Sequence, residues 1–591
     1  MNPLYDKLQE FVQAAFSSLF GFDAEAGKIR FEQTSDIYEG DVTFVVFPFV
    51  KQAKKSPEET ARLLGEFLQA QSSLIERFNV IKGFLNLVIK DDFWIHQIAE
   101  ADKNTFGSIP QKNEIVLIEY SSPNTNKPLH LGHVRNNVLG FALAGIYKAN
   151  GYQTYKANLV NDRGIHICKS MLAWKKWGNG ETPESSGEKG DHLVGKYYVE
   201  FDKKYKAEIE ALISNGKTKE EAEKTAPVFL EVQQMLRQWE AGDAETVALW
   251  KMMNDWVYAG FDVTYKRLGV NFDKYYYESK TYLLGKDIVQ EGLEKNVFFK
   301  KSDGSVWVDL TADGLDEKVI LRADGTSLYI TQDLGTADLK YKDFHMNKSI
   351  YVVANEQDYH FKVLKLILQK LGKPYADGIF HFSYGMVDLP SGKMKSREGT
   401  VVDADDLMDE MVNSAQEQTE LLGKIEGFSE EERKHLYETI GLGALKFFLL
   451  RVDPKKRILF DPQESIDLHG YTGPFVQYAY ARTRSVLRKF GEAVPDKVAV
   501  SSIGQYEKDL VKYLYNFPII LQESCNEMNP AKLVDYAYEL AKTFNKFYAE
   551  CPILNNEDEQ QKLFRLKLTE LSGLAIKKAF NILGIDVPER M

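Results

Sequence analysis

The chain has 591 residues, a formal net charge of −12 and 44% hydrophobic residues. At this length we expect about three or four domains with cores of their own. The acidic balance argues against a general nucleic-acid binder, although a local basic face can coexist with it. The cysteines lie far apart and lack CxxC spacing, which argues against a disulfide framework or a zinc knuckle (Cys168, Cys525 and Cys551).

The first residues, MNPLYDKLQEF, do not resemble a signal peptide, and no apolar stretch approaches the length of a membrane span. We therefore expect a cytoplasmic protein that does not associate with membranes.

Residues 1–110 predict a small α+β domain. Short strands are expected at 29–33, 42–49 and 84–89, and Ser56 followed by proline and two glutamates is typical of a helix start. The chain opens with an amphipathic helix whose apolar face would comprise Leu8, Phe11, Val12, Ala15 and Phe16.

Between residues 111 and 462, apolar segments alternate with helical ones. This alternation predicts an α/β domain with a Rossmann-like parallel sheet and crossover helices. A long charged helical stretch, about 180–273, is interpreted as an insertion into this domain. The expected strands are 115–119, 152–159, 306–309, 327–330, 350–354 and 379–384.

Residues 463–591 predict an all-α helical bundle, with helices at 475–490, 507–516, 529–550 and 560–582. Basic side chains gather on two of these helices and could contact a phosphate backbone. Charge runs alone, however, are more often solvated helix surface. The basic residues are Arg482, Arg484, Arg488 and Lys489 on one helix and Arg565, Lys567, Lys577 and Lys578 on another.

The segment after the strand 115–119 carries the first chemical motif, His130-Leu131-Gly132-His133, with Lys127 just before it. A helix is expected to start near His130, and a helix start attracts phosphate because its first N–H groups are unpaired. Gly132 would let a phosphate approach the backbone closely. The motif therefore indicates a nucleotide-phosphate site, the alternative being a structural pair of histidines.

The second motif is a basic stretch between two glycines, SGKMKSREG at 391–399. Cations on such a loop could neutralise a leaving pyrophosphate. Taken alone, the stretch is better interpreted as a surface turn.

Together the two motifs resemble the HIGH and KMSKS signatures of class I aminoacyl-tRNA synthetases. The wording around them resembles bacterial-type arginyl-tRNA synthetases more specifically, and the likeness covers almost the whole chain. It is carried by the segments 119–136, 327–333, 351–360 and 473–482 and by the ending Pro-Glu-Arg-Met.

The resemblance implies an arginine–tRNA ligase that forms arginyl-adenylate from arginine and ATP and then transfers arginine to the 3′ end of its cognate tRNA. It implies catalytic roles for Lys127, His130, His133 and Lys393. ATP would be bound by His130, Gly132, His133, His360, Lys393, Met394 and Ser396. Arginine would be held by Glu119, Ser122, Asn124, Tyr329, Asp333 and Gln357.

The chemistry of arginine agrees independently with this set, because a guanidinium prefers planar carboxylates and an aromatic face. Tyr329 and Asp333 are four residues apart and would share a face if a helix starts there. The alternatives are a strand-end surface carboxylate for Glu119, a packed aromatic for Tyr329 and a surface histidine for His360.

The basic stretch departs from the signature, because its second lysine is displaced or missing. The resemblance implies that Lys127 compensates, the alternative being a solvated loop lysine. Gln332 stands where related chains often carry a basic residue, so it is given no role.

The expected partners are tRNA, L-arginine and ATP with Mg²⁺. We expect no protein-bound structural metal, and we expect the enzyme to be a monomer. The resemblance implies that tRNA must bind before arginine is activated. It also implies that the N-terminal module contacts the tRNA corner and that the bundle reads the anticodon. Candidate tRNA contacts are Arg482, Tyr478 and Arg488, with Tyr480 and Phe475 as further aromatics of which at least one should be core.

Two other readings remain open. A synthetase of another specificity is disfavoured, since cysteinyl enzymes need zinc cysteines and glutamyl or glutaminyl enzymes need cations where Glu119 and Asp333 stand. A non-catalytic RNA-binding paralogue predicts an eroded phosphate site, whereas its expected residues are all present (Lys127, His130, His133 and Lys393).

Overall fold

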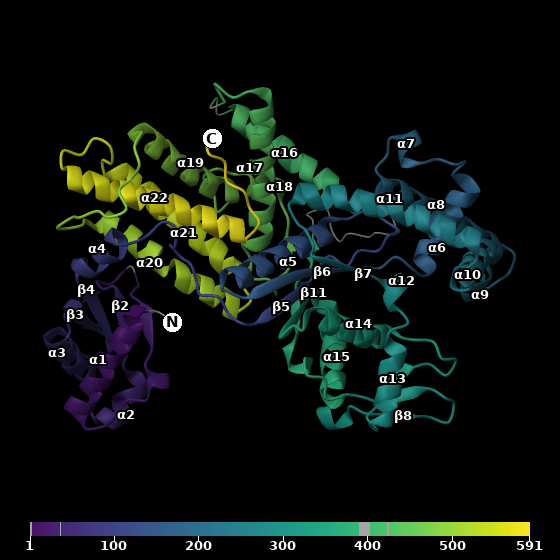
Figure 1. Ribbon diagram of the computed structural model, residues 1–591, viewed down its shortest axis with the longest axis horizontal. Helices are drawn as coiled ribbons and strands as arrows, with labels where there is room; N and C mark the ends of the chain where they lie inside the picture. The colour runs from purple at the N-terminus through teal and green to yellow at the C-terminus, as the bar shows by residue number, and fades with distance from the viewer. Residues whose placement is uncertain (1–2, 36, 389–401, 422, 424) are drawn as a thin grey trace.

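The computed structural model describes residues 3–35, 37–388, 402–421, 423 and 425–591. These residues form an N-terminal α+β module, a parallel-sheet domain with insertions and a C-terminal helical bundle (Figure 1). The predicted fold class is confirmed.

The N-terminal module is an antiparallel sheet of order β1-β2-β4-β3 packed against helices. Leu8, Val12 and Phe16 of α1 are fully buried, as the amphipathic pattern predicts. Ser56 accepts a hydrogen bond from the Glu59 amide and so caps the predicted helix. The elements are α1 (Pro3–Phe20), β1 (Phe31–Gln33), β2 (Val42–Val45), α2 (Val50–Ala53), α3 (Pro57–Gln71), β3 (Ile75–Ile81), β4 (Phe84–Ile89) and α4 (Asp91–Ala99).

The central sheet has five parallel strands in the order β12-β11-β5-β6-β7. Its first strand in sequence, β5, is in the middle, and the connections reverse direction between β5 and β11. Sheets of this kind bind ligands beyond the carboxyl ends of the strands at that reversal. The strands are β5 (Ile115–Glu119), β6 (Gln153–Val160), β7 (Lys274–Tyr277), β11 (Lys348–Ala354) and β12 (Ile379–Tyr384), and the associated helices are α5 (Leu131–Ala149), α6 (Ile165–Trp177), α14 (Tyr329–Phe344) and α15 (Asp358–Lys370).

Two insertions extend this domain. The first is helical, lies between β6 and β7, and forms the arm that carries α8 and α11 (Figure 1). The second contains a small antiparallel sheet of order β10-β9-β8. Their elements are α7 (Pro183–Ser186), α8 (Gly190–Ser214), α9 (Lys219–Thr225), α10 (Pro227–Glu240) and α11 (Ala244–Leu268), then α12 (Glu278–Thr281), α13 (Gly285–Glu294), β8 (Phe298–Lys300), β9 (Val306–Val308) and β10 (Lys318–Leu321).

Two strand predictions require correction. The segment at 306–309 is a strand, β9, but it belongs to the antiparallel sheet and not to the parallel one. The segment 327–330 is not a strand, because Thr331 Oγ1 accepts a hydrogen bond from the Leu328 amide and α14 starts at Tyr329. A short apolar run cannot by itself distinguish a strand from a helix start.

Beyond β12 the chain is mostly helical and ends in the C-terminal bundle. The remaining elements are β13 (Val387–Asp388), α16 (Ala404–Leu421), α17 (Glu430–Leu450), β14 (Ile458–Leu459), α18 (Pro462–Ser465), α19 (Gly473–Phe490), α20 (Gln505–Asn526), α21 (Pro530–Glu550) and α22 (Glu559–Ile582). Among the helices of the described part of the chain, none is long and apolar enough to cross a membrane.

Candidate active site

The loop that leaves β5 is held in an unusual conformation. Ser121 and Ser122 both have positive φ, 77° and 47°. Two asparagines hold the turn: the Ser121 amide donates to Asn136 Oδ1 at 2.5 Å, and the Ser122 amide donates to Asn158 Oδ1 at 3.1 Å. Non-glycine residues in this region are strained and persist only where neighbours fix them. The loop therefore has a preset shape at the sheet's ligand-binding edge.

Beyond that turn the loop stays close to the sheet. Asn124 forms a parallel bridge with Asn161, and the Thr125 amide donates to the Asn161 carbonyl at 3.0 Å. Ser122 is exposed and Asn124 is partly exposed. Both predicted residues thus stand beyond the carboxyl ends of β5 and β6.

His130 and His133 form a reciprocal cap at the start of α5. Nδ1 of His130 accepts a hydrogen bond from the Gly132 amide at 3.1 Å, and Nδ1 of His133 accepts one from the His130 amide at 3.2 Å. A Cβ added at Gly132 would lie 2.9 Å from His130 Cε1, so glycine gives the ring its place. The predicted helix start is confirmed, with His130 as the capping residue.

Both imidazoles are neutral. Burial, aided by the positive charge of Lys127, lowers the pKa of His130 to about 4, although Asp403 opposes the shift. Burial also holds the pKa of His133 well below its ordinary value, with His130 and Lys127 adding to the effect. Because each Nδ1 accepts a backbone hydrogen bond, each ring carries its proton on Nε2. The pair can therefore offer two N–H donors to phosphate oxygens.

A pocket of about 310 Å³ opens beside this cap. Its lining includes Lys127 and His130 of the motif, His192 of α8, and Asp403. The insertion predicted at 180–273 thus reaches the motif. Lys393, Met394 and Ser396 lie outside the described residues.

The second group of predicted residues gathers on α14 and α15. Asp333 Oδ2 lies 2.6 Å from Nε2 of His360, which joins a residue expected at the arginine to one expected at the adenosine. Tyr329 begins α14 and is 73% exposed, which excludes the packed-aromatic alternative. Gln357 is exposed at the start of α15.

Glu119 is buried, so it is not the surface carboxylate of the alternative reading. Its Oε2 lies 2.5 Å from the ammonium of Lys340, which also stands 4.3 Å above the ring centre of Tyr351. Burial alone would lower the pKa of Lys340, but the facing carboxylate reverses this effect and raises it. Glu119 therefore already has a cation beside it.

The sequence reading missed Lys340 and also Glu278. Burial raises the pKa of Glu278 to about 7, with Arg163 opposing and the charges of Asp162 and Asp333 adding to the shift. Several acids are thus crowded near Asp333, which favours a cationic ligand. Neither residue belongs to a motif, and both reach the site through the fold alone.

The predicted tRNA contacts lie on α19. The Arg482 guanidinium stands over Tyr478 at 4.9 Å and over Tyr548 at 5.0 Å from the ring centres. Arg488 is exposed and donates to the Glu589 carbonyl at 2.9 Å.

Some of the aromatic and basic residues that were expected on a tRNA-contacting surface are buried or bonded within the protein. Tyr480 is buried and donates to Glu589, so it is the core member of its set. Lys567 is fully buried and donates to the Asp496 carbonyl, and Lys578 donates to the Phe106 carbonyl at 2.5 Å. The basic face is therefore smaller than the sequence suggests.

Three family profiles match the chain in order. They are the arginyl tRNA synthetase N terminal domain at residues 6–89, the catalytic domain of class I (R) tRNA synthetases at 95–461, and the DALR anticodon binding domain at 476–591.

Curated relatives match over the full length. The arginine–tRNA ligase of Amoebophilus asiaticus is 55% identical over 99% of each chain, and that of Bacteroides thetaiotaomicron is 53% identical over 99% of each. Among solved structures, the arginyl-tRNA synthetase of Thermus thermophilus covers 100% of both chains with a TM-score of 0.81 at 24% identity. That last likeness concerns the fold.

Proposed function

This chain belongs to the arginyl-tRNA synthetase family. From that premise we propose that the histidine cap of α5 binds the phosphates of ATP and that the acidic group around Asp333 binds the side chain of arginine. The protein is an arginine–tRNA ligase: it activates arginine with ATP and esterifies its cognate tRNA. The observation that carries the proposal is the neutral histidine cap of α5 at the same sheet edge as the acidic group around Asp333.

At the phosphate end, the arginine carboxylate attacks the α-phosphorus of ATP, and pyrophosphate leaves. The protein's contribution is positioning and charge stabilisation, because such a transfer needs little covalent help. The Nε2–H groups of His130 and His133 and the ammonium of Lys127 supply donors where oxygen charge grows. ATP enters as its Mg²⁺ complex, so the metal arrives with the substrate.

At the arginine end, Asp333 takes the guanidinium, with Tyr329 against it and Gln357 nearby. Asp333 fits this role because its carboxylate is partly exposed and contacts His360 through Oδ2, whereas Glu119 is buried against the ammonium of Lys340. Glu119 then acts as buried negative charge behind the pocket. Ser122 and Asn124 hold the amino-acid end beside the ATP phosphates.

In the second step, a ribose hydroxyl of the tRNA 3′-terminal adenosine attacks the arginyl carbonyl, and AMP leaves. We assign Arg482, Tyr478 and Arg488 to the tRNA surface, where the Arg482 guanidinium stands near two aromatic rings and the exposed Arg488 offers positive charge. The proposal includes a monomeric cytoplasmic enzyme.

The test is ATP–pyrophosphate exchange with each amino acid, with and without tRNA. We expect exchange only with arginine and only when tRNA is present. Exchange driven by another amino acid, or no exchange under any condition, would overturn the assignment.

The arginine pocket has its own test in Asp333→Asn. Losing one partner of a hydrogen-bonded charge pair costs about 2–5 kcal/mol, so the KM for arginine should rise by roughly 30-fold or more. Asp343→Asn is the matched control, since Asp343 lies on the same helix with a side chain 29% exposed against 30% for Asp333. An unchanged KM in Asp333→Asn would remove Asp333 from the pocket.

A further inference from the structure

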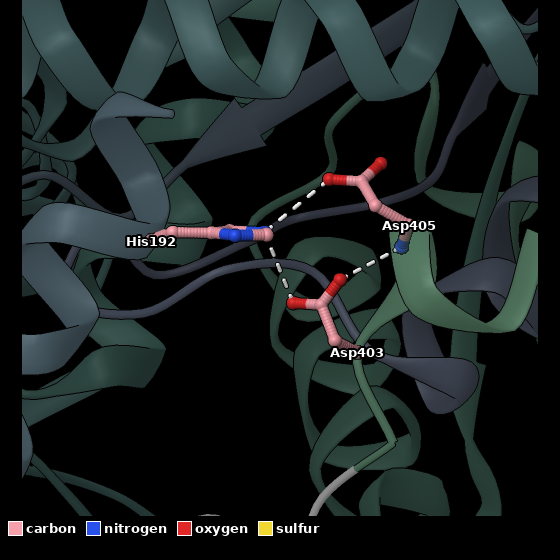
Figure 2. A group of neighbouring side chains, drawn as sticks. All are labelled: His192, Asp403 and Asp405. Carbon is pink, nitrogen blue, oxygen red and sulfur yellow. Dashed lines mark hydrogen bonds and ion pairs between the residues drawn. The ribbon is translucent and has the colours of Figure 1, made fainter. Parts of the chain in front are cut away.

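An ionic cluster joins the helical insertion to the start of α16 (Figure 2). Nε2 of His192, on α8, lies 3.2 Å from Asp403 Oδ2 and 3.3 Å from Asp405 Oδ2. Lys189 forms a further ion pair with Asp405, and Thr264 of α11 donates to Asp405 Oδ1 at 2.9 Å. Two insertion helices therefore hold the two aspartates.

The cluster sets Lys189 and His192 against three carboxylates: Asp403, Asp405 and the buried Asp191, whose Oδ2 lies 3.3 Å from Lys189. The close carboxylates of Asp403 and then Asp405 raise the pKa of His192 to about 10, so the imidazole is a cation at neutral pH. A protonated imidazole cannot ligate a metal, and Lys189 contacts the same oxygen of Asp405, Oδ2, as His192 does. The cluster is thus a set of ion pairs that fixes two segments of chain.

Asp403 belongs to a segment that contacts the catalytic motif directly. The Leu131 amide donates to the Val402 carbonyl at 3.1 Å, and the Ala404 amide donates to the Leu129 carbonyl at 3.0 Å. These bonds flank His130, whose backbone forms an antiparallel bridge with Asp403. The extended backbone of His130, with φ −136° and ψ 172°, is therefore set by its pairing with residues 402–404.

The same aspartate also organises the helix that follows. Asp403 Oδ1 accepts hydrogen bonds from the amides of Asp405 at 2.8 Å and Asp406 at 3.4 Å. One carboxylate thus caps α16 through Oδ1 and contacts His192 through Oδ2. A shift of His192 would be transmitted through the side chain of Asp403 to residues 402–404, which lie beside His130.

We propose that His192 is a positioning residue for arginine activation: through Asp403 it holds residues 402–404 against the backbone that flanks His130 and so fixes that imidazole at the ATP phosphates. The inference rests on the proposed function of His130. It also gives the insertion a role in the active site.

The test is arginine-dependent exchange in the presence of tRNA, with KM measured for ATP and for arginine. A small misplacement of a catalytic group can cost up to about 100-fold in rate, so His192→Ala should lower kcat by roughly 10- to 100-fold. The KM for arginine should change by less than about twofold, because the arginine pocket keeps its contacts. Lys204→Ala is the control on α8, since Lys204 is exposed and paired with Glu200.

Three further single variants and one double variant, His192→Ala with Asp403→Asn, separate positioning from general damage. His192→Lys keeps a positive charge and should recover most of the lost rate, whereas His192→Gln keeps only a donor and should recover less. Asp403→Asn still caps α16, because asparagine is as good a cap as aspartate, but it loses the ion pair. Since His192 acts through Asp403, the double variant should be no slower than His192→Ala alone.

If His192→Ala catalysed exchange at the wild-type rate, the inference would be overturned while the proposed function would stand. The same holds for additive losses in the double variant, or for a loss that lysine fails to rescue and that accompanies a fall in unfolding temperature. Absence of exchange in the wild type would overturn the proposed function, and the inference with it.

Discussion

The histidines of the motif act as donors because their protonation is decided by the helix they cap. Each Nδ1 is occupied by a backbone N–H, so a second proton could be added only by breaking the cap. Among the described residues, Lys127 and the start of α5 then supply positive charge at the phosphate end. A neutral donor pair has a consequence that can be measured outside catalysis.

We expect His130→Asn to make the protein less sensitive to acid. The pKa of His130 is about 4 in the folded protein against an ordinary value of 6.5. Between these values the unfolded chain binds a proton that the folded chain does not, so folding stability falls as pH falls. At about pH 5 this penalty is about 2 kcal/mol, and asparagine removes it while still capping the helix.

The measurement is the apparent unfolding temperature at about pH 7.5 and about pH 5. The fall in unfolding temperature from the higher to the lower pH should be smaller in His130→Asn than in the wild type. Some of the fall should remain, because the buried His133 is still present. His469→Asn, at an exposed histidine, is the control and should behave as the wild type does. Equal drops in both variants would show that His130 is protonated in the folded state.

Residue-scale prediction succeeded where chemistry is local in sequence. The cap of α5 was readable from the residues of the motif itself, whereas the helix that brings Tyr329 and Asp333 onto one face was missed, because 327–330 was predicted as a strand. The ion pair of Glu119 with Lys340 was not readable, since its two residues come from different crossover units. His192 was equally hidden, because a charged helix in an insertion resembles any solvated helix.

At the scale of elements, α5 connects the two halves of the molecule. It starts at the catalytic cap and runs between the sheet and the bundle (Figure 1). Asn150, just beyond its end, donates to the Leu521 carbonyl of α20 at 2.9 Å. A Cβ added at Gly145 would overlap the carbonyl oxygen of Ile582 at the end of α22. Periodicity located α5, but only the packing explains a glycine inside it.

Gly145→Ala should therefore destabilise the protein, although alanine is the better helix former. Propensity alone would favour alanine by about 1 kcal/mol, whereas overpacking against a backbone carbonyl costs typically about 1–3 kcal/mol. We expect a lower unfolding temperature and a weaker attachment of α22 to α5.

Thermal unfolding and amide hydrogen exchange of α22 measure the two effects. Gly27→Ala is the control, because a Cβ there meets nothing within 4 Å. A rise in unfolding temperature for Gly145→Ala would mean that the end of α22 moves aside to accept the methyl group without a loss of stability.

At the scale of the whole molecule, the N-terminal module is fastened to the bundle by a nearly buried carboxylate. The side chain of Asp41 is 4% exposed and contacts two lysines of α20, Lys508 at 3.4 Å and Lys512. Asp41 Oδ2 also accepts a hydrogen bond from the Ile89 amide at 2.7 Å. Lys508 also lies 3.0 Å from Asp91, so the bundle contacts the module on both sides of the carboxyl end of β4.

Removing one partner of such a buried pair costs about 3–5 kcal/mol, because the remaining charges lose their match. Asp41→Asn should therefore loosen the module from the bundle while leaving the sheet edge with its histidine cap and Asp333 untouched. If both parts hold the same tRNA, as we propose, the KM for tRNA should rise by roughly 10-fold or more and that for arginine should stay constant. Aminoacylation kinetics with limited proteolysis between residues 90 and 110 would measure both effects.

Asp509→Asn is the control, since Asp509 faces the same groove but bonds only its helix neighbour Gln505 among the contacts described. An arginine KM that moves with the tRNA KM would mean that the module's docking shapes the catalytic site itself.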